Sequence, residues 1–321
     1  MRLGIRSIPL FSILLILSAC TENAPTTPGT TDSTATVSLA SMYSTLPDVA
    51  NGNPGVLKES ERQKALNYVN AIRSLHKLPL VAYHSADDAG ITSAALIIAA
   101  NNTLDHNPQP SLKFWSQAGA DASSKSNLSI HLWSGSNESI PTTETIIDGW
   151  LADSANAFPG HRAWLLSPFL KWISFSRVDK PWSGSEWGVD GAVIKVIYTD
   201  EQNANAMPVD FVAYPFETYP ARLVNSEIDY SFSVIADRSG MFANSDKVKY
   251  DNATISIVGE HGEKAPVGNV RADYQNFGIP NHLLWRTSLQ SGVRYTVSIN
   301  NVVVNGQSRN YSYYINLSTT V

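Results

Sequence analysis

The sequence has a single cysteine, Cys20, so no disulfide can form within the chain. Each domain must therefore be stable through its hydrophobic core alone. Charged residues are few, at 16% of the chain, and no stretch is strongly basic. Because nucleic-acid binding needs a basic surface, nucleic acid is not an expected partner. Beyond the first twenty residues, no apolar run is long enough to cross a membrane.

Two common signatures of hydrolases are absent as well. There is no Gly-x-Ser-x-Gly elbow for a nucleophilic serine and no His-Glu-x-x-His pair for a metalloprotease. Catalysis through either motif is therefore not predicted, and no residue is assigned a catalytic role. The length of 321 residues is sufficient for two domains.

Residues 1–20 have the layout of an export signal. Two arginines precede an apolar run over residues 8–17, and Leu17-Ser18-Ala19-Cys20 closes it. This ending resembles the bacterial lipoprotein box, whose cysteine is acylated and becomes the new N-terminus. The alternative is an ordinary signal peptide with a chance cysteine. We expect a lipoprotein signal peptide and a lipid anchor on Cys20, which would attach the protein to a membrane of the cell envelope. Because no aspartate follows Cys20, we expect the outer membrane or the cell surface.

Residues 21–57 are predicted to be a flexible linker. Up to about residue 38 the chain consists mainly of Thr, Ser, Pro, Gly and Ala, with almost nothing apolar. Such a segment cannot bury enough surface to fold and acts as a spacer. The remainder, up to residue 57, is expected to be irregular.

Residues 58–205 are predicted to form one domain that contains helices followed by strands, an α+β arrangement. Apolar residues recur at helical spacing after several capping residues and then alternate with polar ones. The expected helix starts are Ser60, Ser85 and Thr142, and the expected antiparallel strands are residues 172–178 and 192–198. A further short helix is expected after Pro159-Gly160 and before Pro168. It would hold His161 beside bulky core residues at the edge of a cavity.

Residues 206–321 are predicted to form an all-β domain. Short alternating stretches are separated by turn residues, and Asn305-Gly306 is a strong hairpin signal. The expected strands include residues 222–224, 230–235, 253–258, 283–285, 294–299 and 311–317. About seven short strands fit an immunoglobulin-like sandwich of the disulfide-free kind. A fold alone assigns this domain no task.

Several segments between residues 60 and 200 resemble the CAP superfamily, also called SCP-like or pathogenesis-related-1-like domains. The likeness rests on the order and spacing of residues 66–73, 78–80, 150–153, Leu104-Asp105-His106-Asn107-Pro108 and Gly160-His161-Arg162-Ala163-Trp164. Exported bacterial members with a further β domain look especially similar, including the segment Ser126-Asn127-Leu128. The resemblance implies an α-β-α sandwich with a cleft, which two histidines and two acidic residues face.

The resemblance assigns these cleft positions residue by residue. His106 and His161 take the histidine roles, and Asp153 stands where the family usually has Glu. The second acidic residue normally precedes an asparagine such as Asn127, and here Ser126 occupies that place. This departure removes one of the four cleft groups, so the complete metal site of the family is not expected. Asp121 or Glu138 would have to replace it.

Two uses of the cleft residues remain open. His106, His161 and Asp153 could hold Zn²⁺ or another divalent metal with one open position, as a hydrolytic site requires. Alternatively, the histidines only hydrogen-bond loops and carboxylates and thereby fix the cleft walls.

The sequence favours binding over catalysis. We expect a lipid-anchored CAP-like protein whose cleft, formed by His106, Ser126, Asp153 and His161, binds an apolar ligand such as a sterol or fatty acid, another protein, or an envelope polymer. One alternative is a zinc-assisted hydrolase that uses the same cleft. The other is a passive structural adhesin that acts through the β domain.

Overall fold

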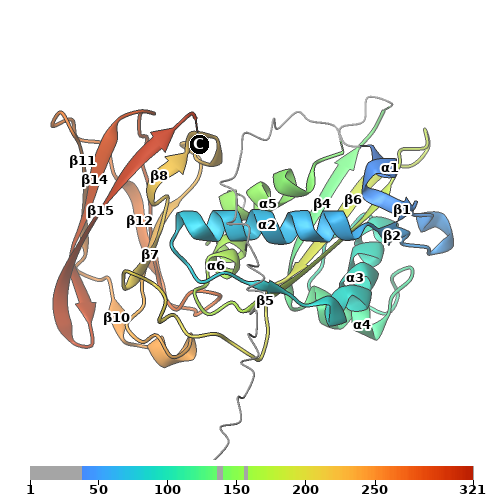
Figure 1. Cartoon of the computed structure of the whole chain (residues 1–321), viewed down its shortest axis with the longest axis horizontal. Coiled ribbons are helices and arrows are strands. Elements are labelled where there is room, and N and C mark those ends of the chain that lie inside the picture. Colours follow the sequence, from blue (N-terminus) through green and yellow to red (C-terminus); the bar gives the residue numbers. More distant parts are fainter. Residues whose placement is uncertain (1–37, 136–139, 155–157, 321) are drawn as a thin grey trace, which may run out of the picture.

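The computed structural model describes residues 38–135, 140–154 and 158–320. Helices and strands alternate up to β6 and strands dominate afterwards, so the protein is of the mixed α+β class, as predicted (Figure 1). We call the elements α1 to β6 the helical part and the elements β7 to β15 the β part.

The helical part contains α1 (Leu39–Met42), β1 (Tyr43–Thr45), η1 (Val49–Asn51), β2 (Val56–Leu57), α2 (Glu59–Leu75), β3 (Ala82–Tyr83), η2 (Ser85–Asp87), α3 (Asp88–Asn101), α4 (Gln117–Ser123), β4 (Ser126–Trp133), α5 (Thr143–Ala152), α6 (Gly160–Leu165), β5 (Trp172–Lys180) and β6 (Gly188–Lys195). The β part contains β7 (Phe211–Tyr214), β8 (Glu217–Pro220), η3 (Ala221–Leu223), β9 (Tyr230–Val234), η4 (Phe242–Asn244), β10 (Val248–Lys249), β11 (Thr254–Gly259), β12 (Gly268–Asp273), β13 (His282–Arg286), β14 (Arg294–Val304) and β15 (Gln307–Ser318).

A four-stranded sheet of order β3-β5-β6-β4 forms the centre of the helical part. β6 is antiparallel to both β5 and β4, whereas β3 is parallel to β5. Alternate residues of a strand face opposite sides of the sheet. Val189 and Val193 of β6 accordingly join a core cluster with α3, while Ala192 and Ile194 join the cluster that contains α2 and α5. Helices therefore cover both faces of this sheet.

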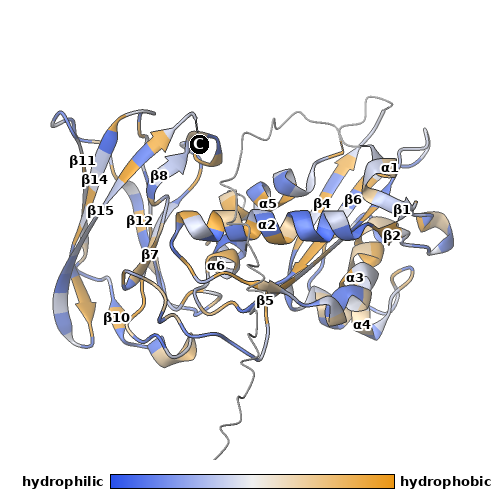
Figure 2. Ribbon diagram, in the orientation of Figure 1, coloured by the Kyte–Doolittle hydropathy of each residue, from blue (hydrophilic) through white to orange (hydrophobic). Residues whose placement is uncertain are grey.

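The helices that frame the site begin and end at recognisable signals. α2 buries Ala65, Val69 and Ile72 at helical spacing, and its outward side is hydrophilic (Figure 2). α5 begins as predicted, because the Thr142 side chain accepts a hydrogen bond from the backbone N–H of Thr145 at 3.1 Å. α6 begins at Gly160, directly after the predicted turn.

Two sheets face each other in the β part. One has the order β12-β13-β9-β7, and the other has the order β10-β14-β15-β8 with β11 also paired to β14. Aromatic rings fill the space between them, as where Phe232 and Tyr311 lie with ring centroids 5.2 Å apart. Asn305-Gly306 joins β14 to β15, which confirms the predicted hairpin.

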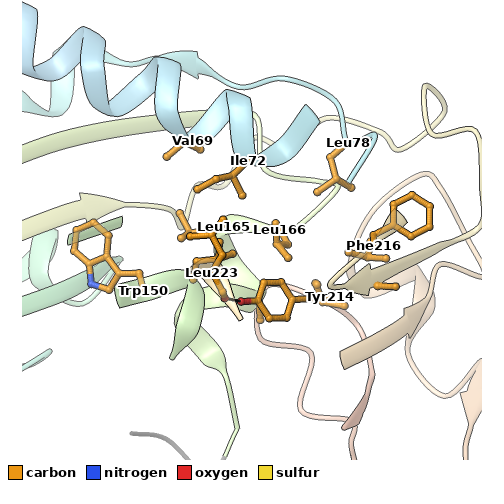
Figure 3. Close-up of a cluster of buried hydrophobic side chains, with 14 of the residues drawn as sticks. Val69, Ile72, Leu78, Trp150, Leu165, Leu166, Tyr214, Phe216 and Leu223 are labelled. Atoms are coloured by element: carbon orange, nitrogen blue, oxygen red, sulfur yellow. Dashed lines mark hydrogen bonds between the residues drawn. The ribbon is translucent and has the colours of Figure 1, made fainter. Parts of the chain in front are cut away.

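The two parts share one hydrophobic core. Ile72 and Leu165 of the helical part lie in the same cluster as Tyr214, Phe216 and Leu223 of the β part (Figure 3). A core that crosses the boundary makes relative movement of the two parts costly, because it would expose apolar surface.

Hydrogen bonds from buried groups also cross this boundary. Nδ1 of His76, at the end of α2, donates to the carbonyl of Ala213 at 2.8 Å, and Nε2 accepts from the Tyr219 hydroxyl at 3.1 Å. Nearby, the Arg222 guanidinium donates to the Asp148 carboxylate at 2.6 Å. The position of the β part relative to the helical part is thus set by polar as well as apolar contacts.

Several expectations from the sequence are wrong in detail. α2 begins at Glu59 without a side-chain cap, and α3 begins at Asp88 after a 3-10 turn, so neither Ser60 nor Ser85 caps its helix. Residues 222–224 are not a strand, because the chain forms the 3-10 helix η3 there. The strand expected at residues 192–198 is shifted and ends at Lys195. Residues 126–133, for which no strand was predicted, form the strand β4.

The predicted linker is also too long. Residues 39–57 contain α1, β1, η1 and β2 instead of irregular chain. Met42 and Tyr43 are buried, and the Tyr43 hydroxyl donates to the Asp179 carboxylate at 2.6 Å. These contacts attach the segment to β5. Residues 21–37 and the proposed lipidation site Cys20 lie outside the described residues.

Within the described ranges, every helix is too short or too polar to span a membrane.

Candidate functional site

A cavity of about 380 Å³ lies where α6 meets the β part, and we call it the junction cavity. It brings together His106 and His161, which are far apart in the sequence, and Ser126 lines it as well. The helical part contributes His106, Ser124, Ser126, Asn127, Phe158, Gly160, His161, Ala163, Trp164 and Ile197, and the β part contributes Asp273, Gln275, Phe277 and His282. Three of the four cleft residues expected from the sequence therefore share one cavity.

The fourth expected residue, Asp153, lies behind His161. It ends α5 in the left-handed conformation with φ of 47°, which aspartate tolerates better than most residues. One carboxylate oxygen accepts from the backbone N–H of His161 at 2.7 Å, and the other lies 3.1 Å from Nδ1 of the same residue. Both residues also line a neighbouring hollow of about 360 Å³.

Asp153 determines how His161 presents its ring. A carboxylate can only accept, so Nδ1 of His161 carries the proton and Nε2 is left as an acceptor in the neutral ring. The first turn of α6 holds the backbone of His161 in place. The pair thus orients an imidazole acceptor at the cavity wall.

His106 is arranged in the same way by a different partner. It lies just beyond α3, as expected, after Asn102 ends that helix in the left-handed conformation. Nδ1 of His106 donates to the carbonyl of Ser123 at 3.0 Å. A carbonyl can only accept, so Nε2 of His106 is again the acceptor in the neutral ring. The cavity is therefore lined by two histidines with the same tautomer.

Ser126 and Asn127 begin β4 and line the junction cavity together with the two histidines. The Ser126 hydroxyl donates to the carbonyl of Ala122 at 2.7 Å, so its proton is already engaged. Nδ2 of Asn127 donates to the carbonyl of His161 at 3.0 Å. Oδ1 of Asn127 is buried and has no hydrogen-bond partner among the described residues. In the sequence, Asn127 only marks the position next to Ser126, whereas in the structure it is a polar group of the site.

His282 of β13 is the residue that the sequence analysis missed. It is 5% exposed, and neither ring nitrogen has a hydrogen-bond partner in the part of the chain that the structure describes. Burial, assisted by the positive charge of Arg162, lowers the pKa of His282 to about 3, so the ring is neutral near neutral pH. No local motif marks this histidine, since it is only the first residue of an apolar strand.

Arg162 is buried beside the site and is held mainly by an aromatic ring. Its guanidinium lies 4.2 Å from the ring centroid of Tyr214, a cation–π arrangement. Burial lowers the pKa of Arg162, while the charges of Asp153 and Asp229 oppose this shift. Arg162 does not line the junction cavity itself.

The metal site considered from the sequence is not supported by this geometry. Both oxygens of Asp153 accept from His161, so the carboxylate is directed to the histidine. Among the described residues, no group of three or more His, Cys, Asp or Glu side chains is arranged to hold a metal ion. Asp121 lines a separate hollow on α4, and Glu138 lies outside the described residues. Among the described residues, His106, His161 and Asp153 are therefore not arranged as a three-ligand metal site.

No model of a known protein family matches this chain, and a search of curated proteins finds no significant relative.

Proposed function

We propose that this chain is an exported, lipid-anchored, CAP-like protein of the cell envelope that binds a ligand in the junction cavity. The observation that carries the proposal is the pair of histidines. His106 and His161 line one cavity, and each has its Nδ1 engaged by a fixed acceptor, which leaves Nε2 to accept from a ligand. Pockets that bind small molecules combine apolar walls with a few oriented polar groups.

The layered helical part agrees with the CAP-like fold that the resemblance implies, and the two-sheet β part agrees with the immunoglobulin-like sandwich predicted from the spacing of the strands. The order of helices around the sheet β3-β5-β6-β4 supports the first assignment, and the facing sheets of the β part support the second.

The hydrolase alternative has less support. A histidine oriented by a carboxylate is a common general base, and Asp153 with His161 has that form. However, the Ser126 hydroxyl donates to Ala122 rather than to a histidine, and both carboxylate oxygens of Asp153 already contact His161. The adhesin alternative does not account for a cavity that both parts of the chain line.

A binding measurement tests the proposal directly. Purified protein would be titrated by calorimetry with palmitate, cholesterol and an N-acetylglucosamine tetramer. We expect saturable binding of at least one compound, and the double variant His106→Ala, His161→Ala should weaken it at least tenfold while circular dichroism stays unchanged. The exposed His261 of the β part supplies a control variant, His261→Ala, which should bind like the wild type. Binding that survives the double variant would contradict the proposed site.

A further inference from the structure

The β part forms a wall of the junction cavity instead of serving only as a spacer. The loop between β12 and β13 rests on the helix that carries His161. Gly278 of this loop is so close that an added Cβ would lie 2.6 Å from the backbone of Ala163 and Trp164. This contact holds Phe277 and His282, on either side of Gly278, against the cavity.

Three buried polar atoms of the cavity lack partners. They are Oδ1 of Asn127 and both ring nitrogens of His282, within the described ranges of the chain. Asn127 is 1% exposed and His282 is 5% exposed, and both residues line the junction cavity. Buried polar groups in folded proteins are nearly always hydrogen-bonded. Asn127 and His282 are therefore the cavity-lining residues whose hydrogen-bonding capacity is not used by the described protein groups.

The unpartnered atoms define what the ligand must offer. A neutral imidazole provides one donor and one acceptor, and an amide oxygen accepts. Nε2 of His106 and Nε2 of His161 are two further acceptors, so the cavity wall offers more hydrogen-bond acceptors than donors from these four residues. A hydrocarbon chain cannot satisfy such groups, whereas a molecule rich in hydroxyl or amide N–H groups can.

The charge of the cavity wall and its aromatic side chains further restrict the class of ligand that can bind. The residues that line the cavity include one carboxylate, Asp273, and neither lysine nor arginine, which disfavours fatty-acid carboxylates and phosphates. The buried Arg162 lies behind the wall, and Asp153 and Asp229 offset its charge. Trp164 and the 57% exposed Phe277 add flat apolar surface. A neutral sugar ring combines hydroxyl groups at its edge with an apolar C–H face.

We infer that the junction cavity binds a neutral saccharide held by both parts of the chain, with His282 and Asn127 as hydrogen-bonding residues and Phe277 as a stacking surface. The inference rests on the proposed function, because it names the ligand class of the same cavity. It also makes the β part a determinant of specificity.

The test uses the full chain and two soluble probes, an N-acetylglucosamine tetramer and a maltose tetramer, with palmitate as the comparison. We expect a saccharide to bind and palmitate not to compete. His282→Leu removes two unpartnered polar atoms from a buried position, so it should lower saccharide affinity at least tenfold without lowering the melting temperature. A purely structural histidine would show the opposite, lost stability and retained affinity, and that result would overturn the inference.

Phe277→Ala should weaken saccharide binding several-fold. Phe242 is also in the β part and is 70% exposed but does not line the cavity, so Phe242→Ala should leave binding unchanged. Co-sedimentation with isolated peptidoglycan distinguishes a polymer source from free oligosaccharides, and His282→Leu should reduce it equally.

The remaining outcomes separate the two proposals. If only palmitate or cholesterol binds and the double variant of His106 and His161 abolishes it, the saccharide inference fails and the proposed function stands. If a saccharide binds but the double histidine variant does not weaken its binding, the saccharide binds outside the junction cavity. Both the proposed site and the saccharide inference then fail. If none of the probes binds, both are contradicted.

Discussion

His76 and His282 are both buried histidines at the boundary between the two parts, but only His76 has its hydrogen bonds completed. His76 donates to Ala213 and accepts from Tyr219, which is how a structural histidine is usually satisfied. His282 has the same burial and no such partners. At the scale of single residues, this difference distinguishes the packing role of His76 from the binding role proposed for His282.

The same two histidines predict how stability depends on pH. Burial lowers the pKa of each to about 3, well below the ordinary value of 6.5. The unfolded chain therefore binds more protons below pH 6.5, so stability is highest above this value and falls as the pH drops toward about 3. Each histidine contributes about 1.4 kcal/mol per pH unit to the slope of the unfolding free energy in that window.

Urea denaturation between pH 6 and pH 4.5 measures this slope. The variant His282→Leu should reduce it by the contribution of one histidine. His76→Gln should do the same, although its folded state will also be weaker because two hydrogen bonds change. Equal slopes in the wild type and both variants would contradict the assignment of buried neutral histidines.

At the scale of elements, the contact between α6 and the loop from β12 to β13 assembles the site. α6 carries His161 and is fixed from behind by Asp153, while the loop closes the cavity from the other side. The loop can approach this closely only because position 278 is a glycine with φ of 73°. A change at this single contact should therefore affect both stability and binding.

Gly278→Ala tests that contact. The added methyl group meets both an unfavourable φ and the backbone of α6, so we expect a loss of about 2–3 kcal/mol in unfolding free energy and weaker ligand binding. Gly262 provides the matched control, since its φ is 90° but no atom lies within 4 Å of an added Cβ. Gly262→Ala should cost about 1–2 kcal/mol from backbone strain alone and leave binding intact. Equal effects of the two variants on binding would argue against a role for the loop contact.

At the scale of the whole molecule, the helical part and the β part are joined by a common core and by polar contacts across the boundary. Leu223, from η3 of the β part, lies in the cluster with Ile72 and Leu165 (Figure 3). The neighbouring Arg222 guanidinium crosses the boundary and donates to the Asp148 carboxylate of α5 at 2.6 Å. We therefore expect the two parts to unfold together.

Leu223→Ala examines this coupling. Removing a buried leucine side chain should lower the unfolding free energy by about 2–5 kcal/mol. Differential scanning calorimetry should show one transition that moves to lower temperature as a whole. The exposed Leu132 offers a control, as Leu132→Ala should change the transition little. Two separate transitions, with only one affected, would show that the parts fold independently.

The predicted lipid anchor also concerns the whole molecule. If Cys20 is acylated, Cys20→Ala should move the protein from the membrane fraction to the soluble fraction of cells, because the buried acyl chains supply the membrane affinity. Immunoblotting of separated fractions measures this. Unchanged fractionation would contradict lipidation.

Local patterns in the sequence were sufficient for those elements whose signals are local. A proline and glycine before a short apolar run predicted α6, a threonine cap predicted α5, and Asn305-Gly306 predicted the hairpin of β14 and β15. The strand β4 was missed because its serines and asparagine suggest a loop. It is a strand because it pairs along its whole length with β6, which is a tertiary contact.

The sequence by itself determined the mixed α+β class and the short helix that carries His161, because each follows from neighbouring residues. The two histidines became candidates through the resemblance to the CAP superfamily. Only the tertiary structure decided that Asp153 is directed to His161 rather than to a metal, that Asn127 has an unpartnered oxygen, and that His282 completes the cavity from the β part. The physical reason is that burial and hydrogen-bond partnership depend on which distant segments pack together. No local pattern records that a histidine at the start of an apolar strand will be enclosed beside α6.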